Sequence, residues 1–234
     1  MADSNNKQLM EKVIVALDVK EQAKALELIE QISPPIDFYK VGLELYTLVG
    51  NDFVSRLKEQ GMKVFLDLKL YDIPTTVSRA VASISNLMPD MITVHASGGA
   101  QMLKAAVSAA REVSPKTKVL AVTVLTSLDS DALIQIGMQP DIKEAIRKLA
   151  GLAYESGCDG IVCSAVDLED LRDLYPSPFL MVTPGIRLAE EETHDQKRTS
   201  TPIDAIKQGA DYLVIGRSIS AQKQPKSALD RIFA

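Results

Sequence analysis

Apolar runs of strand length recur along this chain, and segments with helical spacing separate them. The runs are rich in β-branched residues and are flanked by Gly, Pro or Asp, which favours strands. Most are apolar on both faces, as in a parallel sheet that helices cover. The predicted strands are 13–19, 37–45, 63–70, 91–97, 118–126, 159–165, 179–186 and 211–219.

The segments between these runs place apolar residues on one side of a helix. Gly61, Gly157 and Gly209 each follow such a segment and precede a strand, as glycines at helix C-termini do. The clearest helical segments are 21–32, with Ala25, Leu28, Ile29 and Ile32 on one face, 96–113 and 140–157.

Eight such strand–helix units predict an α/β fold, a (β/α)8 TIM barrel, which typically needs about 250 residues. An open doubly wound sheet is the alternative, and it would leave two edges unpaired. The sequence contains no linker rich in Pro, Gly or Ser and no shift in composition. We therefore expect one barrel domain over residues 1–234, with residues 1–11 as a polar N-terminal extension.

Composition and charge exclude several classes of protein. The 234 residues are 46% hydrophobic and carry a net charge of −5, which argues against binding to nucleic acid or a membrane surface. No apolar run approaches the roughly 18 residues that a transmembrane helix needs, and the N-terminus lacks a signal core. Cys158 and Cys163 are interpreted as reduced core residues. We expect a cytoplasmic protein.

Charged residues interrupt three consecutive predicted strands near their carboxyl ends. Asp67 and Lys69 are two residues apart on the third strand, so their side chains should face the same way. Lys40 lies in the neighbouring strand, Asp18 ends the first strand, and Asp72 follows the third. Burying so many charges is costly unless they are paired, and such costs are retained at functional sites.

A lysine between two carboxylates should remain protonated, because opposite charges favour its charged form. It would then donate a proton rather than act as a nucleophile, which needs a neutral amine. This arrangement suits a reaction that loses CO₂ and protonates the carbon left behind. For any one of these residues, an ion pair at a strand end without chemistry remains the alternative.

The longest polar loop, 187–202, follows the seventh predicted strand. Barrel enzymes place their chemistry on such loops, so this one is either a lid or a solvated surface loop. We interpret His95 as a structural residue, and Tyr39, Phe65 and Tyr71 as packing residues. No cluster has the spacing of a structural zinc site, so no metal site is predicted.

Residues 67–76, DLKLYDIPTT, resemble the DxKxxDIPxT signature of the orotidine 5′-phosphate decarboxylase family, in its bacterial form. Further motifs occur in the family's order. They are ALDV (16–19), FYKVG (38–42), VHASGG (94–99), VTVLTSLD (122–129), TPGIR (183–187), DQKR (195–198) and IGRSI (215–219).

The resemblance implies conversion of orotidine 5′-phosphate to UMP and CO₂ without a metal or organic cofactor. It implies that Lys69 donates the proton to C6 of the pyrimidine, and that Lys40, Asp67 and Asp72 complete a charged tetrad. In this family Asp72 and Thr76 reach into the partner subunit's site, so a homodimer is implied.

The resemblance also implies which residues contact the substrate. Asp18 and Lys40 would contact the ribose hydroxyls, and Thr126 the pyrimidine. The 5′-phosphate would be held by Arg187, Gln196, Arg217 and the backbone N–H groups of Gly216 and Arg217. Barrels commonly bind phosphate after strands seven and eight, which agrees with this placement.

Two other functions remain open at this point. A Mg²⁺-dependent sugar-phosphate decarboxylase or aldolase could share the same barrel and a related DxKxxD motif. A nucleotide-binding barrel that senses UMP without catalysis is the other. The IPTT continuation and TPGIR favour the pyrimidine enzyme over the first, and the intact charged set argues against the second.

Overall fold

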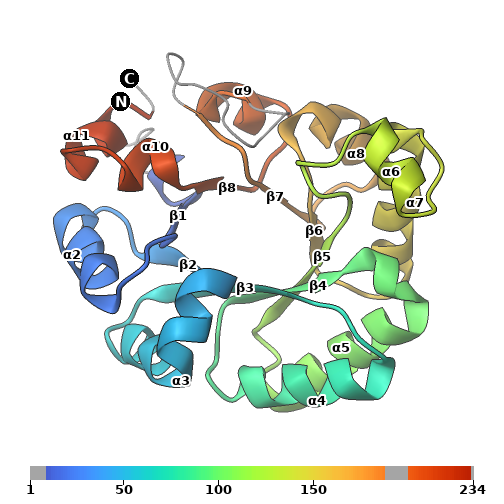
Figure 1. Ribbon diagram of the computed structural model, residues 1–234, viewed down its shortest axis with the longest axis horizontal. Helices are drawn as coiled ribbons and strands as arrows, with labels where there is room; N and C mark the ends of the chain where they lie inside the picture. Colours follow the sequence, from blue (N-terminus) through green and yellow to red (C-terminus); the bar gives the residue numbers. More distant parts are fainter. Residues whose placement is uncertain (1–8, 188–199, 233–234) are drawn as a thin grey trace.

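Eight parallel strands form a closed barrel in which each strand lies beside its neighbours in the sequence (Figure 1). The computed structural model describes residues 9–187 and 200–232, so most of the predicted N-terminal extension lies outside them. Because β8 pairs with β1, the predicted TIM barrel is confirmed and the open sheet is wrong. The strands are β1 (Val13–Ala16), β2 (Phe38–Gly42), β3 (Lys63–Leu70), β4 (Met91–His95), β5 (Lys118–Val122), β6 (Gly160–Val162), β7 (Leu180–Thr183) and β8 (Tyr212–Ile215).

Helices form a ring outside the strands (Figure 1), and the three segments predicted to be helical are helical. Gly61, Gly157 and Gly209 have positive φ, as predicted for helix ends. No helix within the described residues is long and apolar enough to cross a membrane. The helices are α2 (Gln22–Ile32), α3 (Leu43–Glu59), α4 (Pro74–Ser85), α5 (Gly99–Val113), α6 (Ser130–Gln135), α7 (Ile142–Glu155), α8 (Leu168–Leu174), α9 (Pro202–Lys207), α10 (Arg217–Ser220) and α11 (Pro225–Asp230), with the 3₁₀ helices η1 (Ala96–Gly98) and η2 (Ala165–Asp167).

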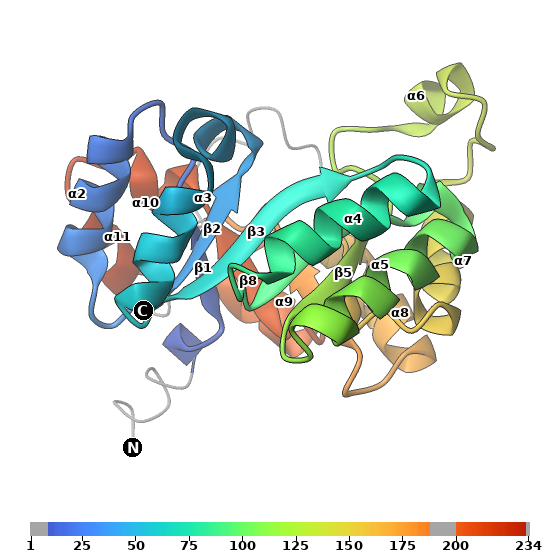
Figure 2. The same ribbon diagram turned by 90° about the horizontal axis from the view of Figure 1, so that it is seen from below.

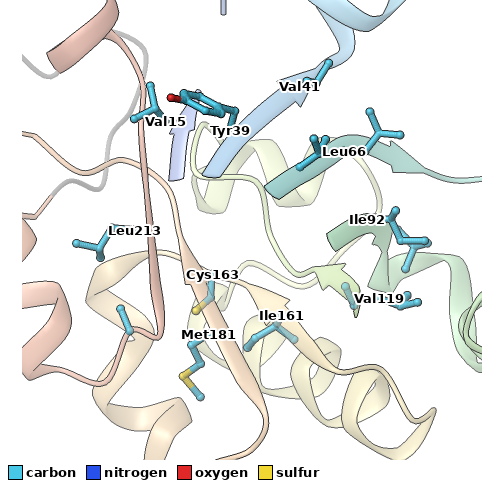
Figure 3. Close-up of a cluster of buried hydrophobic side chains, with 14 of the residues drawn as sticks. Val15, Tyr39, Val41, Leu66, Ile92, Val119, Ile161, Cys163, Met181 and Leu213 are labelled. Carbon is cyan, nitrogen blue, oxygen red and sulfur yellow. The ribbon is translucent and has the colours of Figure 1, made fainter. Parts of the chain in front are cut away.

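Alternation along the strands divides the apolar side chains between two clusters, one inside the barrel and one between strands and helices. The interior cluster contains Ile14, Ala16, Phe38, Phe65, Met91, Leu120, Val182 and Val214. The outer cluster includes Val15, Tyr39, Val41, Leu66, Ile92, Val119, Ile161, Cys163, Met181 and Leu213 (Figure 3). Both faces of the strands are thus buried, which explains the continuous apolar runs in the sequence. Cys158 and Cys163 are buried thiols, as predicted.

Several predicted strands run past the observed carboxyl ends. The second was predicted to end at residue 45, but β2 ends at Gly42 and α3 begins at Leu43. Similarly, residues 217–219 were predicted to belong to a strand and instead form the first turn of α10. Apolar residues such as Leu43, Leu45 and Ile219 suit a helix as well as a strand, so composition does not mark where one ends and the other begins.

Three aspartates join neighbouring strand–helix units at the amino ends of the strands. Each directly precedes an even-numbered strand, and its carboxylate accepts the N–H of the second residue of the preceding strand. Each aspartate also forms an ion pair with a basic residue on the helix that leads into that preceding, odd-numbered strand. The sets are Asp90 with Val64 and Lys58, Asp159 with Val119 and Arg111, and Asp211 with Met181 and Arg172. These contacts stabilise the end of the barrel opposite to the one where barrel enzymes work.

We predict that Arg172 contributes strongly to stability. Its guanidinium donates to the carbonyls of Gly209 at 2.7 Å and Phe179 at 2.9 Å, and it pairs with Asp211 at 2.6 Å. Arg172→Ala should lower the free energy of unfolding by about 2 kcal/mol, because partly buried acceptors lose a charged donor. Urea unfolding measures this loss. Arg147→Ala, which removes only an exposed ion pair, should cost less than about 0.5 kcal/mol, and equal losses would contradict the prediction.

Candidate active site

The predicted charged residues lie one layer above the apolar interior of the barrel. Lys40 follows Phe38 by two residues on β2, and Asp67 follows Phe65 by two residues on β3. Because side chains alternate along a strand, both charged groups face the barrel axis like the phenylalanines below them. Lys40 and Asp67 are buried, with exposed fractions of only 9% and 8%. The apolar layer therefore forms the floor of a charged site at the carboxyl ends of the strands.

Acidic and basic side chains alternate across the first three strands. The Lys40 ammonium donates to Asp18 Oδ1 at 2.9 Å and lies 3.7 Å from Asp67 Oδ2. The Lys69 ammonium donates to both carboxylate oxygens of Asp67, each at 2.8 Å. Asp67 is thus a buried carboxylate between two lysines. The sequence predicted a lysine between two carboxylates, and that description fits Lys40, between Asp18 and Asp67, rather than Lys69.

The electrostatic balance at Asp67 favours its charged form. Burial acts to raise the pKa of this carboxyl, because it penalises the charge. The charges of Lys40 and Lys69, with hydrogen bonds from Lys69 and Thr93, outweigh burial and hold the pKa below its usual value. Asp67 is therefore ionised at neutral pH and fixes the Lys69 ammonium beside it.

Asp67 and Lys69 reach the same side of β3 by an irregular backbone. The β3–β4 pairing matches Leu66 with Ile92 but then Leu70 with Val94, so the register shifts between these pairs. Lys69 has a φ of +51°, which is uncommon for a residue with a side chain. The prediction of a shared face was correct, although a regular period of two is not its cause.

Sequence reasoning missed Thr93, which is fully buried on β4 beside this irregular segment. Its hydroxyl accepts the backbone N–H of Lys69 at 2.8 Å and donates to Asp67 Oδ1 at 3.0 Å. A polar residue two positions after Met91, inside the apolar run MITV, was the available signal.

His95 also lies near the charged cluster, two residues beyond Thr93 on β4. Burial lowers the pKa of its imidazole, and the charge of Lys69 lowers it further against the opposing effect of Asp67. Its ring contacts Tyr71 edge-on, with centroids 5.8 Å apart. His95 is therefore a largely neutral neighbour of the cluster at neutral pH.

A cavity of about 500 Å³ opens above the charged cluster, a size that suits a small-molecule ligand. It brings together residues from strands far apart in the sequence. The predicted site residues that line it are Asp18, Lys40, Asp67, Lys69, Thr126, Arg187, Gly216 and Arg217. Glu44, Phe65 and Cys163 also line it, and were not predicted to do so. One wall comes from the β5–α7 connection, whose helix α6 projects beyond the carboxyl ends of the strands (Figure 2).

Two arginines give the far side of the cavity a positive charge. Arg187 follows β7 and is buried, and its Nε has no hydrogen-bond partner among the described residues. Arg217 follows β8 and is exposed at the cavity. Guanidinium groups bind phosphate bidentately, so this side suits a phosphate. Gln196 and most of the predicted lid, 187–202, lie outside the described residues.

Asp72 and Thr76 do not line the cavity of their own chain. Both are exposed, and Asp72 Oδ1 accepts the N–H of Ile73 at 2.6 Å. The prediction that Tyr71 is a packing residue was wrong, since its side chain is 63% exposed, and Ile73 is 66% exposed. Tyr39 and Phe65 are buried as predicted. The segment after β3 thus presents apolar and acidic side chains to the outside.

The carboxylates of the charged cluster form ion pairs with lysines. Within residues 9–187 and 200–232, no three His, Cys, Asp or Glu side chains form a group that could hold a metal ion. The arrangement can instead offer a positive charge and a proton from Lys69 to a ligand in the cavity.

Comparisons with known proteins agree with this geometry. Residues 11–232 match the family model described as Orotidine 5′-phosphate decarboxylase / HUMPS family. The orotidine 5′-phosphate decarboxylase of Moorella thermoacetica is 43% identical, with 96% of this chain and 91% of the relative covered. The orotidine 5′-phosphate decarboxylase of Actinobacillus succinogenes is 45% identical to this chain, and the match covers 95% of this chain and 97% of the relative. The crystal structure of the Lactobacillus acidophilus orotidine 5′-phosphate decarboxylase matches with a TM-score of 0.84 at 37% identity, covering 94% of this chain and 96% of that one.

The lowered pKa of Asp67 predicts how stability depends on pH. Since the folded value lies below 3.8, the ionised carboxyl contributes its full stabilisation above pH 3.8 and loses it as the pH falls through the folded value. Asp67→Asn should therefore lower the free energy of unfolding most at neutral pH, and this difference should shrink below pH 3.8. Urea unfolding of wild type and Asp67→Asn at neutral pH and below pH 3.8 measures this difference. A difference for Asp67→Asn that stays constant between the two pH values would contradict the prediction.

Proposed function

The chain belongs to the orotidine 5′-phosphate decarboxylase family, and from this membership we propose that it converts orotidine 5′-phosphate to UMP and CO₂, the last step of de novo pyrimidine synthesis. The observation that carries this proposal is the Lys69 ammonium, held by a buried carboxylate at the floor of a cavity whose far side is cationic. The end of the cavity at Lys69 can receive the reacting carboxylate of the substrate, and the end at Arg187 and Arg217 can receive its phosphate.

In the proposed mechanism, the bond between C6 and the carboxylate carbon breaks and its electron pair stays on C6. The pyrimidine ring delocalises this charge poorly, so catalysis depends on a preorganised positive charge. The Lys69 ammonium supplies that charge as the carbanion forms and then transfers a proton to C6. Solvent reprotonates the amine after product release. No cofactor or metal ion is part of this proposal.

Asp67 and Lys40 prepare Lys69 for this role. Asp67 holds the ammonium through both oxygens, and Lys40 balances its negative charge from the other side. The Asp67 charge also repels the substrate carboxylate when the two are brought together, and that repulsion ends as CO₂ leaves. Asp18 holds Lys40 in turn. Both line the cavity, and from the family resemblance they are proposed to contact the ribose hydroxyls.

Phosphate binding is proposed for Arg187, Arg217 and the backbone N–H groups of Gly216 and Arg217, and pyrimidine binding for Thr126. All four line the same cavity as Lys69. Gln196, outside the described residues, is proposed to bridge phosphate and base. The phosphate is remote from C6, so its binding energy can support closure of loop 187–202 as a lid and exclusion of water.

A homodimer is proposed to complete the tetrad. Asp72 is exposed outside the cavity of its own chain, and two exposed apolar side chains, Tyr71 and Ile73, flank it. Exposed apolar groups next to an acid suit a surface that a second copy covers. In the dimer, Asp72 and Thr76 would enter the partner subunit's site. A cytoplasmic location completes the proposal, since the pathway is cytoplasmic.

The first test is direct assay of the purified protein, following loss of orotidine 5′-phosphate by absorbance. We expect turnover that EDTA does not reduce, whereas a Mg²⁺-dependent enzyme would lose activity and a sensor would show none. Lys69→Ala should lower kcat roughly a thousandfold or more, because both the charge at C6 and the proton donor are lost. The control is Lys63→Ala, which removes an exposed ion pair at the amino end of β3 and should retain full activity.

A mixing experiment tests the shared site. Lys69→Ala and Asp72→Ala should each be nearly inactive, but a reassorted mixture should recover about a quarter of wild-type activity, since half of random dimers are mixed and each holds one intact site. Mixing Lys69→Ala with Asp67→Asn is the matched control. Both changes fall in the same chain's cluster, so no site is intact and activity should stay low. Equal results from the two mixtures would refute the exchange of Asp72.

A further inference from the structure

The Thr93 hydroxyl lies where the register between β3 and β4 shifts. Between two matched pairs, the stretch Leu66–Leu70 of β3 lies opposite the shorter stretch Ile92–Val94 of β4, so β3 carries extra residues. Thr93 is the central residue of the shorter stretch, and its side chain is fully buried. It is not among the residues that line the cavity.

The direction of both hydrogen bonds at Thr93 follows from the groups involved. The backbone N–H of Lys69 can only donate, so the Thr93 oxygen accepts at 2.8 Å. The hydroxyl's single proton is then available to Asp67 Oδ1 at 3.0 Å, and an ionised carboxylate can only accept. One hydroxyl therefore joins the backbone of the proposed proton donor to the carboxylate that holds its ammonium.

The same hydroxyl supports an unfavourable backbone. Lys69 has a φ of +51°, a region that residues with a side chain rarely adopt and that costs free energy. A buried N–H also needs a hydrogen-bond partner. Where the strand register shifts, the Thr93 side chain supplies that partner. Without the hydroxyl, the Lys69 N–H would lose its hydrogen bond, and the positive-φ conformation of Lys69 would be less stable.

We propose that Thr93 is a positioning residue for the decarboxylation, and that its hydroxyl holds the Lys69 backbone and the Asp67 carboxylate so that the ammonium stays aimed into the cavity. This inference rests on the proposed function. It extends the charged tetrad to a neutral residue on the next strand, which is buried and does not line the cavity.

Three variants separate positioning from the general effect of deleting a buried hydroxyl. Thr93→Val keeps the shape and removes both hydrogen bonds, whereas Thr93→Ser keeps the hydroxyl. Thr123→Val is the matched control, because Thr123 is also buried and its hydroxyl donates to the Val162 carbonyl at 3.1 Å rather than to a member of the charged cluster. Should Thr93→Val fail to fold, Thr93→Ala replaces it in every comparison.

We expect Thr93→Val to lower kcat roughly ten- to a hundredfold, as the loss of a hydrogen bond to a charged group implies. KM should change less than about twofold, because the phosphate-binding groups are untouched. Thr93→Ser should stay within about threefold of wild type, and Thr123→Val should be unchanged. A similar kcat for Thr93→Val and Thr123→Val, or an equal loss in Thr93→Ser and Thr93→Val, would overturn the proposal.

The pH profile gives a readout that loss of packing alone would not move. The charged or titratable groups around Asp67 are Lys40 on β2, Lys69 on β3 and His95 on β4, and all remain in Thr93→Val. Removing the Thr93 donor should raise the pKa of Asp67, so the acid limb of kcat should move to higher pH in Thr93→Val alone.

A measurement without turnover separates this inference from the proposed function. NMR titration of the Asp67 carboxyl carbon in the three variants reports its pKa directly. If the wild type shows no decarboxylation, the proposed function fails, and this titration decides the role of Thr93. A higher Asp67 pKa in Thr93→Val than in Thr123→Val and Thr93→Ser supports the link, and equal values overturn it.

Discussion

The structure depends on a negative charge that is buried between two lysines. An isolated carboxylate at the position of Asp67 would be expelled to solvent or protonated, because burial penalises its charge. Lys40 and Lys69 make the ionised form favourable, and Asp67 in turn holds both ammonium groups. Asp67 would be costly alone, and Lys40, which is equally buried, is held by Asp67 and Asp18 together. The buried charge and the proposed chemistry are therefore one feature.

The closed barrel provides the rigid frame that this charge set needs. Its two ends use the same pairing of aspartate with Lys or Arg for different purposes. At the amino ends, Asp90, Asp159 and Asp211 are satisfied by basic side chains and backbone N–H groups, and they link neighbouring units. At the carboxyl ends, the pairing extends into a chain of charges that borders a cavity. The stabilising contacts and the proposed chemistry thus lie at opposite ends of the strands.

Much of this could be predicted from the sequence, because it depends on local patterns. The apolar runs recur at intervals that only a barrel of eight units satisfies without edges. Asp67 and Lys69, two residues apart in an apolar strand, could be assigned to one face, and Lys40 to the strand beside them. Strand ends were less certain, since the apolar residues from Leu43 onward serve a helix as well as a strand.

The sequence by itself determined the fold, the family and the charged residues, because the hydrophobic period and the spacing of motifs depend only on the order of residues along the chain. Only the tertiary structure decided what depends on neighbours across strands. It placed Thr93 against Asp67 and Lys69, and it gave Lys69 its left-handed backbone. It also exposed Asp72 outside the cavity of its own chain. These three features depend on strand register and packing. Residues that are distant in the sequence determine them together, so the sequence pattern near each residue does not reveal them.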